Sequence, residues 1–217
     1  MAVNIQRIKQ EQVVFLRNED IFTITQRGVT TATDTGTFSS DSSHLINVSN
    51  GKNVRSITVG GSAIALGTDY TVDYNFDDSG TIKIKITFVA AQTGDFSIPY
   101  DFGSDKIYPD FPRDDLTIDS YPRIAIDILN VNIDAFGIGG SNFISDVAFT
   151  VVVYDDNTDD LDGYIQTIKD TYVTNSRNFF YLKFIKPILI GPTIVSPNKY
   201  DEIMSKNIDL VGMFEVD

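Results

Sequence analysis

Period-two alternation of apolar and polar residues dominates residues 54–100. Gly60-Gly61 and residues 77–80 interrupt it with typical turn sequences. One apolar and one solvated face are what an antiparallel sheet requires. The pattern therefore predicts a small antiparallel β-sandwich or meander. Its apolar positions are Ile57, Val59, Ile64, Leu66, Tyr70, Val72, Tyr74, Ile82, Ile84, Ile86 and Phe88, followed beyond the polar stretch 92–95 by Phe96, Ile98 and Tyr100.

Helical periodicity follows the acidic cluster at residues 155–160. Leu161, Tyr164, Ile165, Ile168 and Tyr172 recur at helical offsets and form one stripe, which predicts a helix of about four turns. Strand-like runs lie on both sides of it along the chain. The order strand, strand, helix, strand, strand predicts an α+β unit in which a mixed or antiparallel sheet carries one long helix.

Four details refine this second unit. The apolar phase flips between Ile128 and Leu129, which predicts a β-bulge there. Glycines at residues 137–140 predict a hairpin turn and not a phosphate loop, because no helix follows them. Phe180, Leu182 and Phe184 alternate as a strand, and we expect Pro187 to end its pairing. Residues 186–207 are then expected to form an extended loop or hairpin before a C-terminal strand at 208–216.

The N-terminal part of the chain gives weaker patterns. Residues 3–18 place Ile5, Ile8, Phe15 and Leu16 near one face of an amphipathic helix, which can pack on its own domain or dock on a neighbouring subunit. Residues 23–50 are rich in Ser, Thr, Asp and Gly, and we expect an irregular surface loop.

These patterns divide the chain into four parts. Residues 1–22 form an N-terminal helix or arm, and residues 23–103 form a β-rich domain with a polar loop. Residues 104–120 form a proline-containing linker, because Pro109 and Pro112 prevent a continuous regular element. Residues 121–217 form the α+β domain.

Charge and composition narrow the functional classes. Seventeen Lys and Arg residues against thirty Asp and Glu residues give a formal net charge of −13. Such a surface repels phosphate, so we expect neither sequence-specific DNA binding nor adhesion to anionic lipid. The sequence has no cysteine, which excludes disulfides and thiolate metal sites. It shows neither a signal peptide nor a long apolar run, and we expect no membrane association.

No catalytic or metal-binding motif stands out. His44 is the only histidine and falls in the expected polar loop, so no Ser–His–Asp arrangement is available. Asp155, Asn157 and Asp159 match alternate ligands of a calcium loop. The pattern then fails, because the glycine and glutamate positions hold Asp160 and Gln166. We expect instead that Thr158 or Asp159 caps the helix. The chain is expected to be no enzyme and to bind no cofactor.

The C-terminal part resembles the tail terminator proteins of long-tailed phages and related archaeal viruses. The resemblance rests on the proline-plus-apolar strand start SYPRIAI at 120–126, the strand end VVVY at 151–154 before a capped helix, and the C-terminal run IDLVGMF at 208–214. It covers somewhat less than the last half of the chain. A short stretch at 67–74, GTDYTVDY, also resembles a β-module of phage structural proteins.

The resemblance implies a structural virion protein. It would form a ring, usually a hexamer, that stops growth of the tail tube and joins it to the head–tail connector. DNA would pass through as non-specific cargo, and an acidic lining would keep it from sticking. The expected subunit contacts are aromatic and arginine side chains in and near the linker and in the late proline-rich segment: Tyr108, Phe111, Arg113, Tyr121, Arg123 and Tyr200.

Two alternatives stay open. One is a virion- or cell-surface adhesin whose β-domain holds carbohydrate or protein on an aromatic cluster, with Tyr70, Tyr74 and Tyr100 as candidates. The other is a neighbouring connector-completion protein, which shares the ring geometry. The mass of the particle in solution discriminates between terminator and adhesin: a ring supports the terminator, and a stable monomer or trimer that binds glycans supports the adhesin.

Overall fold

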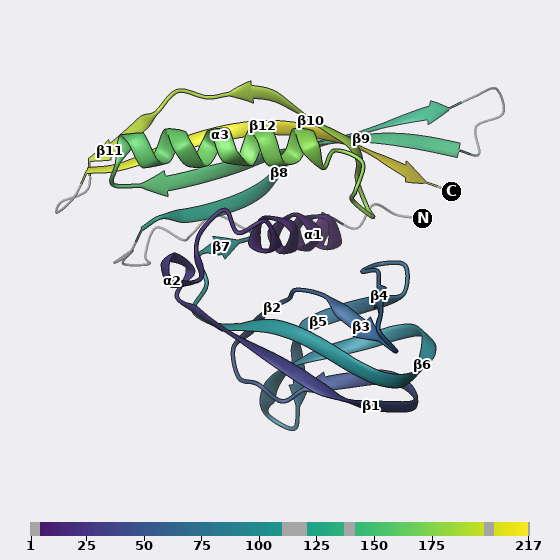
Figure 1. The fold of residues 1–217 in the computed structure, drawn as a ribbon. Coiled ribbons are helices and arrows are strands. Elements are labelled where there is room, and N and C mark those ends of the chain that lie inside the picture. Colours follow the sequence, from purple (N-terminus) through teal and green to yellow (C-terminus); the bar gives the residue numbers. More distant parts are fainter. Residues whose placement is uncertain (1–4, 110–120, 137–141, 198–201, 217) are drawn as a thin grey trace. The chain divides into compact units, whose positions relative to one another are not determined.

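The structure, a computed structural model, describes residues 5–109, 121–136, 142–197 and 202–216. The chain divides into two compact units (Figure 1). Residues 23–105 form the first, called here the β unit. Residues 1–22 and 106–217 form the second, called here the α+β unit. Each unit has its own hydrophobic core.

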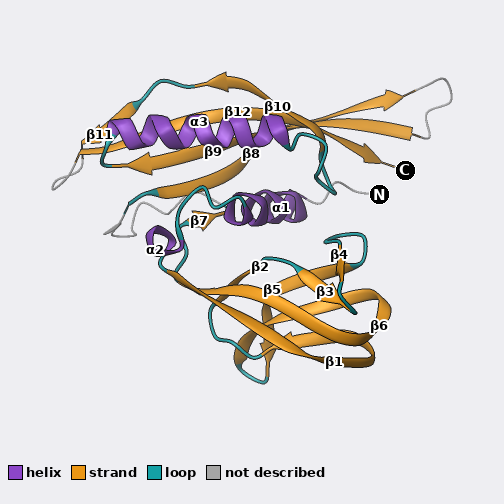
Figure 2. Ribbon diagram, in the orientation of Figure 1, coloured by secondary structure: helices purple, strands orange, loops and turns teal. Residues whose placement is uncertain are grey.

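The β unit is built around one long antiparallel pair (Figure 2). Strands β1 and β6 pair from Val29 opposite Gly103 to Ile46 opposite Ile84. Strands β2, β3 and β5 also pair with β6, and β4 pairs with β3 across the turn at Gly60-Gly61, as predicted. The elements are α2 (Ile24–Arg27), β1 (Val29–Ile46), β2 (Gly51–Val54), β3 (Ile57–Val59), β4 (Ser62–Ile64), β5 (Tyr70–Asp78) and β6 (Thr81–Gly103).

One expectation for this unit is wrong. Residues 29–46 are not an irregular loop but the strand β1. Its alternate threonines are β-branched and suit an extended chain, while Phe38 and Ile46 supply the few buried contacts that it needs. The polar stretch 92–95 lies within a strand. It continues β6, where Gly94 lies opposite Phe38.

The α+β unit contains a mixed sheet with strand order β10-β12-β9-β8-β7. All neighbours are antiparallel except β7 and β8, and β11 also pairs with β12. This confirms the predicted α+β class. The elements are α1 (Ile5–Asn18), β7 (Ile107–Tyr108), β8 (Arg123–Phe136), β9 (Asn142–Asp155), α3 (Thr158–Thr174), β10 (Lys183–Ile190), β11 (Ile194–Pro197) and β12 (Glu202–Val216).

Helix α3 buries the predicted stripe against the sheet. Leu161, Ile165, Ile168 and Tyr172 are buried, facing the apolar residues of β9 and β12. Helix α1 packs on β8 and β7, and its Phe15 ring lies 5.1 Å from the Tyr172 ring of α3. Both helices therefore contribute to one core. The predicted N-terminal helix is confirmed, and in this chain it packs on its own unit.

The strand details of this unit are partly as predicted. A register shift between Ile128 and Asn130 confirms the bulge in β8. Strands β8 and β9 form an antiparallel pair, while the glycine segment between them lies outside the described residues. The expectation for β10 is wrong: the strand begins at Lys183 and continues through Pro187, which lies opposite Leu210. An edge strand tolerates this proline because one of its sides needs no ladder bond.

The late proline-rich segment is more ordered than a loop. Strand β11 pairs with β12, from Ile194 opposite Ser205 to Pro197 opposite Glu202. This is the hairpin alternative of the expectation. Strand β12 then runs to Val216 between β9 and the β10–β11 side, so the C-terminal strand is part of the sheet, as predicted.

Candidate functional site

Three of the six predicted contact residues lie close together. Tyr108 in β7, Arg123 at the start of β8 and Tyr121 two residues before it are all half-buried. The Arg123 guanidinium carbon lies 5.9 Å from the centroid of the Tyr108 ring, a cation–π contact. Lys106 Nζ donates a hydrogen bond of 3.3 Å to the Tyr121 carbonyl. The other three predicted residues, Phe111, Arg113 and Tyr200, lie outside the described residues.

Burial shifts the pKa values of the ionisable groups around these residues. Burial lowers the pKa of the Lys106 amine, the Arg123 charge lowers it further, and the Asp155 carboxylate opposes both. Burial also raises the pKa of the Asp155 carboxyl, although hydrogen bonds from backbone amides oppose the shift. The pKa of Tyr154 rises for the same reason, with a smaller contribution from Tyr121. Lys106 thus lies near Arg123 and the Asp155 carboxyl, and Tyr121 lies near Tyr154.

A second surface was not predicted from the sequence. Six large apolar side chains of β10 and β11 are exposed, and even the least exposed of them, Ile190, is 40% accessible. Isolated exposed apolar residues are common, but six of them on two edge strands point to an interaction surface. We call this group the apolar edge: Phe184, Ile188, Leu189, Ile190, Ile194 and Val195.

The apolar edge carries positive charge in an acidic protein. Residues 171–200 contain four basic residues and no acidic one. Lys183 and Lys186 are exposed on β10 itself, and the Arg177 guanidinium carbon lies 5.3 Å from the Phe184 ring centroid. Two sequence signals could have revealed this surface. One is the absence of acids, and the other is three consecutive apolar residues at 188–190, where a strand with one solvated face would alternate.

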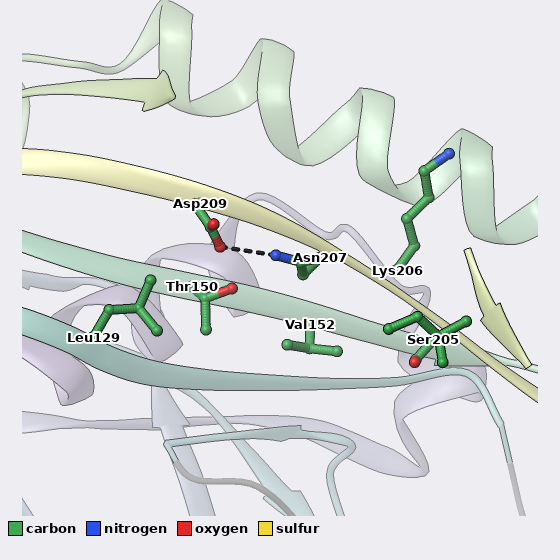
Figure 3. A pocket seen from close by; sticks show the side chains of 8 residues that line it. Leu129, Thr150, Val152, Ser205, Lys206, Asn207 and Asp209 are labelled. Carbon is green, nitrogen blue, oxygen red and sulfur yellow. Dashed lines mark hydrogen bonds between the residues drawn. The ribbon is translucent and has the colours of Figure 1, made fainter. Parts of the chain in front are cut away.

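A shallow groove of about 310 Å³ lies on the sheet (Figure 3). Thr150 and Val152 of β9 line it together with Asn207 and Asp209 of β12, which lie opposite them in the sheet. Asn207 Nδ2 donates a 2.8 Å hydrogen bond to Asp209 Oδ1. No histidine occurs among the described residues that line it.

His44 lies in β1 and not in the loop where it was expected. Its Nε2 lies 2.8 Å from Asp34 Oδ2. The imidazole ring also packs near the rings of Phe38 and Phe96, with centroid distances of 5.5 Å and 4.8 Å. These contacts fix the ring at the border of the β-unit core, which is a packing role.

The aromatic cluster expected for an adhesin is not an exposed platform. Tyr70 is buried in the β-unit core, and burial raises the pKa of its hydroxyl above the ordinary range. Tyr74 is half-buried, and its hydroxyl accepts a 3.0 Å hydrogen bond from the Val54 amide. Tyr100 is also half-buried against the same core.

The acidic cluster before α3 serves the helix. Asn157 is the N-cap, and its side chain accepts a 3.0 Å hydrogen bond from the Asp159 amide. The prediction of Thr158 or Asp159 as the cap is therefore wrong by one or two positions. Asp155 Oδ1 accepts hydrogen bonds from the amides of Asp156 and Asn157. Among the described residues, no group of three or more His, Cys, Asp or Glu side chains is placed to hold a metal ion.

Comparison with models of known protein families gives no match for this sequence. Comparison with curated proteins gives no match either. Over the described part of the chain, no helix combines the length and apolar character needed to cross a lipid bilayer.

Proposed function

We propose that this chain is a structural virion protein, a tail terminator subunit of a long-tailed phage or archaeal tailed virus. Copies of it form a ring, with six subunits as the expected number. The ring ends the tail tube and joins it to the head–tail connector, and DNA passes through it without being read. The proposal assigns the chain no catalytic step.

The observation that carries the proposal is the α+β unit together with its apolar edge. The unit has β8 and β9 before α3 and β10, β11 and β12 after it, which is the strand, strand, helix, strand, strand order of the resemblance with one short strand, β11, added. Its β10 and β11 strands expose six large apolar side chains, and Lys183 and Lys186 are exposed on β10. A chain that uses one patch and a different complementary patch for association closes into a ring when the rotation between subunits allows it.

The charge of the chain supports passage of DNA. A net charge of −13 leaves few cations to hold phosphates, and each bound phosphate would retard a moving duplex. The same charge favours association through the few basic surfaces that the chain has, because these attract the acidic remainder of a second copy.

The test is growth of the tail tube. Purified chain added to polymerising tail-tube protein should end tube growth, and electron micrographs should show a ring at one end of each tube. A connector-completion protein would form the ring but leave tube length unchanged. A surface adhesin would form no ring and would instead bind glycans. Tubes that grow without limit in the presence of the chain would overturn the terminator role.

A further inference from the structure

The β10–β11 side of the sheet has strand partners on one side only. In the described part of the chain, β10 and β11 each pair with β12 and with no other strand. An open edge of this kind invites addition of a further strand, and proteins commonly blunt it with prolines and bulges. Here Pro187 removes a backbone donor, and β10 has two register shifts relative to β12. A partner is therefore held by side chains and not by a continuous added strand.

The side chains of this edge define the chemistry of a partner. The apolar edge offers apolar area on the outermost strands; Lys183 and Lys186 are exposed on β10, and the Arg177 guanidinium lies beside the Phe184 ring. A complementary surface needs apolar side chains at its centre and carboxylates at its rim. Basic surfaces of this type do not fit one another, because pairing two identical edges would bring four lysines together.

The rest of the same chain supplies the opposite charge. Outside residues 171–200, thirty acidic residues face thirteen basic ones. In the α+β unit itself, Asp156, Asp159 and Asp160 are exposed at the start of α3. The positive charge of this edge therefore attracts the acidic surfaces of a second copy. The same edge of that copy is also positive and repels it.

We infer that the β10–β11 edge is the surface by which one copy of this chain docks, head to tail, on a different and acidic surface of the next copy. The inference rests on the proposed ring and names the surface that holds it together. In a head-to-tail assembly the last subunit always has an unused edge that can bind another copy. Such contacts therefore continue as filaments or close into rings. A two-fold dimer through this edge would bring the lysines of both copies together, which disfavours it.

The experiment measures the mass of the full-length protein by sedimentation velocity over a range of concentrations. The test variants are Leu189→Asp, which places a charge within the apolar edge, and Lys186→Glu, which reverses one of its charges. The matched controls are Val89→Asp, at an apolar position in β6 that is more exposed than Leu189 (71% against 56%), and Lys169→Glu on α3. Circular dichroism verifies that each variant is folded.

The wild-type chain and both controls should sediment as the same multi-subunit particle. Both test variants should stay folded, and their dissociation constants for assembly should be at least about tenfold higher than that of the wild type. A tenfold rise corresponds to a loss of about 1.4 kcal/mol of association free energy. Added salt should weaken the wild-type particle, because it screens the charge contact. Test variants that assemble like the wild type would overturn this inference and leave the ring intact. A wild-type chain that stays a single subunit would overturn the ring and the inference together.

Discussion

The carboxylate of Glu11 in α1 accepts a hydrogen bond from the backbone amide of Tyr181, with 3.1 Å between Oε1 and the nitrogen. The amide of Phe180 donates to the same oxygen. Glu11 thereby fixes the segment that leads into β10, far away along the chain. Burial raises the pKa of this carboxyl above its ordinary value, while the backbone amides of Phe180, Tyr181 and Leu182 oppose the shift.

Glu11 should make the stability of the chain depend on pH. Because its pKa is raised on folding, the folded state holds the proton more tightly, and ionisation destabilises the fold as pH rises above 4.5. Wild-type stability relative to Glu11→Gln should therefore fall as pH rises through the raised pKa. Urea unfolding of both proteins from about pH 4 to about pH 8 measures this difference. Parallel curves for the two proteins would contradict the burial of this carboxyl.

Comparing Glu11→Ala with Glu11→Gln separates the effect of losing the hydrogen-bond acceptor from the effect of losing the negative charge. Glu11→Gln keeps one oxygen that can accept from the Tyr181 and Phe180 amides, whereas Glu11→Ala leaves these amides without their acceptor. An unsatisfied buried donor costs about 1–3 kcal/mol. We expect Glu11→Ala to lose about that much unfolding free energy near neutral pH and Glu11→Gln to lose less. Equal losses would show that the amides find solvent instead.

Arg27 should be essential for the stability of the β unit. Its guanidinium is buried and bridges two carboxylates, with Nη1 3.0 Å from Asp101 Oδ2 and Nη2 2.7 Å from Asp105 Oδ2. Removing one partner of a buried ionic group leaves uncompensated charge and costs about 3–5 kcal/mol. Arg27→Met should show that loss in denaturant unfolding.

A surface pair in the same unit provides the control for Arg27. Lys83 Nζ lies 2.6 Å from Asp78 Oδ2, and both side chains are partly solvated. Pairs of this kind contribute less than about 1 kcal/mol, so Lys83→Met should unfold close to the wild type. Similar losses for Arg27→Met and Lys83→Met would show that the buried network does not stabilise the unit.

Two substitutions at the start of α3 test whether Asn157 caps the helix. Asn157 supplies the capping oxygen, so Asn157→Ala should lose about 1 kcal/mol of unfolding free energy. Thr158→Ala, one residue further on, removes no cap and should lose less. Thermal unfolding of the two variants makes the comparison. A larger loss for Thr158→Ala would indicate that Thr158 caps the helix, as predicted from the sequence.

The sequence predicted those elements whose periodicity reports a buried face. The stripe of Leu161, Ile165 and Ile168 indicated α3, and the phase flip after Ile128 indicated the bulge in β8. Strand β1 escaped prediction because most of its side chains are polar and solvated. Its extended conformation comes from pairing with β6, whose partner residues are 38 (Ile46 to Ile84) to 74 (Val29 to Gly103) positions away along the chain. Local composition carries no signal for such pairing.

The candidate contact surfaces show the same limit. Tyr108, Tyr121 and Arg123 were chosen for residue type, and the parallel pairing of β7 with β8 places them together. The apolar edge was missed because Ile188, Leu189 and similar residues read as buried sheet positions. Only the strand order shows that β10 and β11 lie at an edge, and strand order cannot be read from local alternation.

The central claim is that this chain assembles into a closed ring, and the mass of the wild-type particle tests it most directly. One chain has a mass of 24.1 kDa. Sedimentation equilibrium should give a single species of about six times that mass, unchanged over about a hundredfold range of concentration, because a closed ring has no free end to extend. A mass of 24.1 kDa at every concentration would contradict the account.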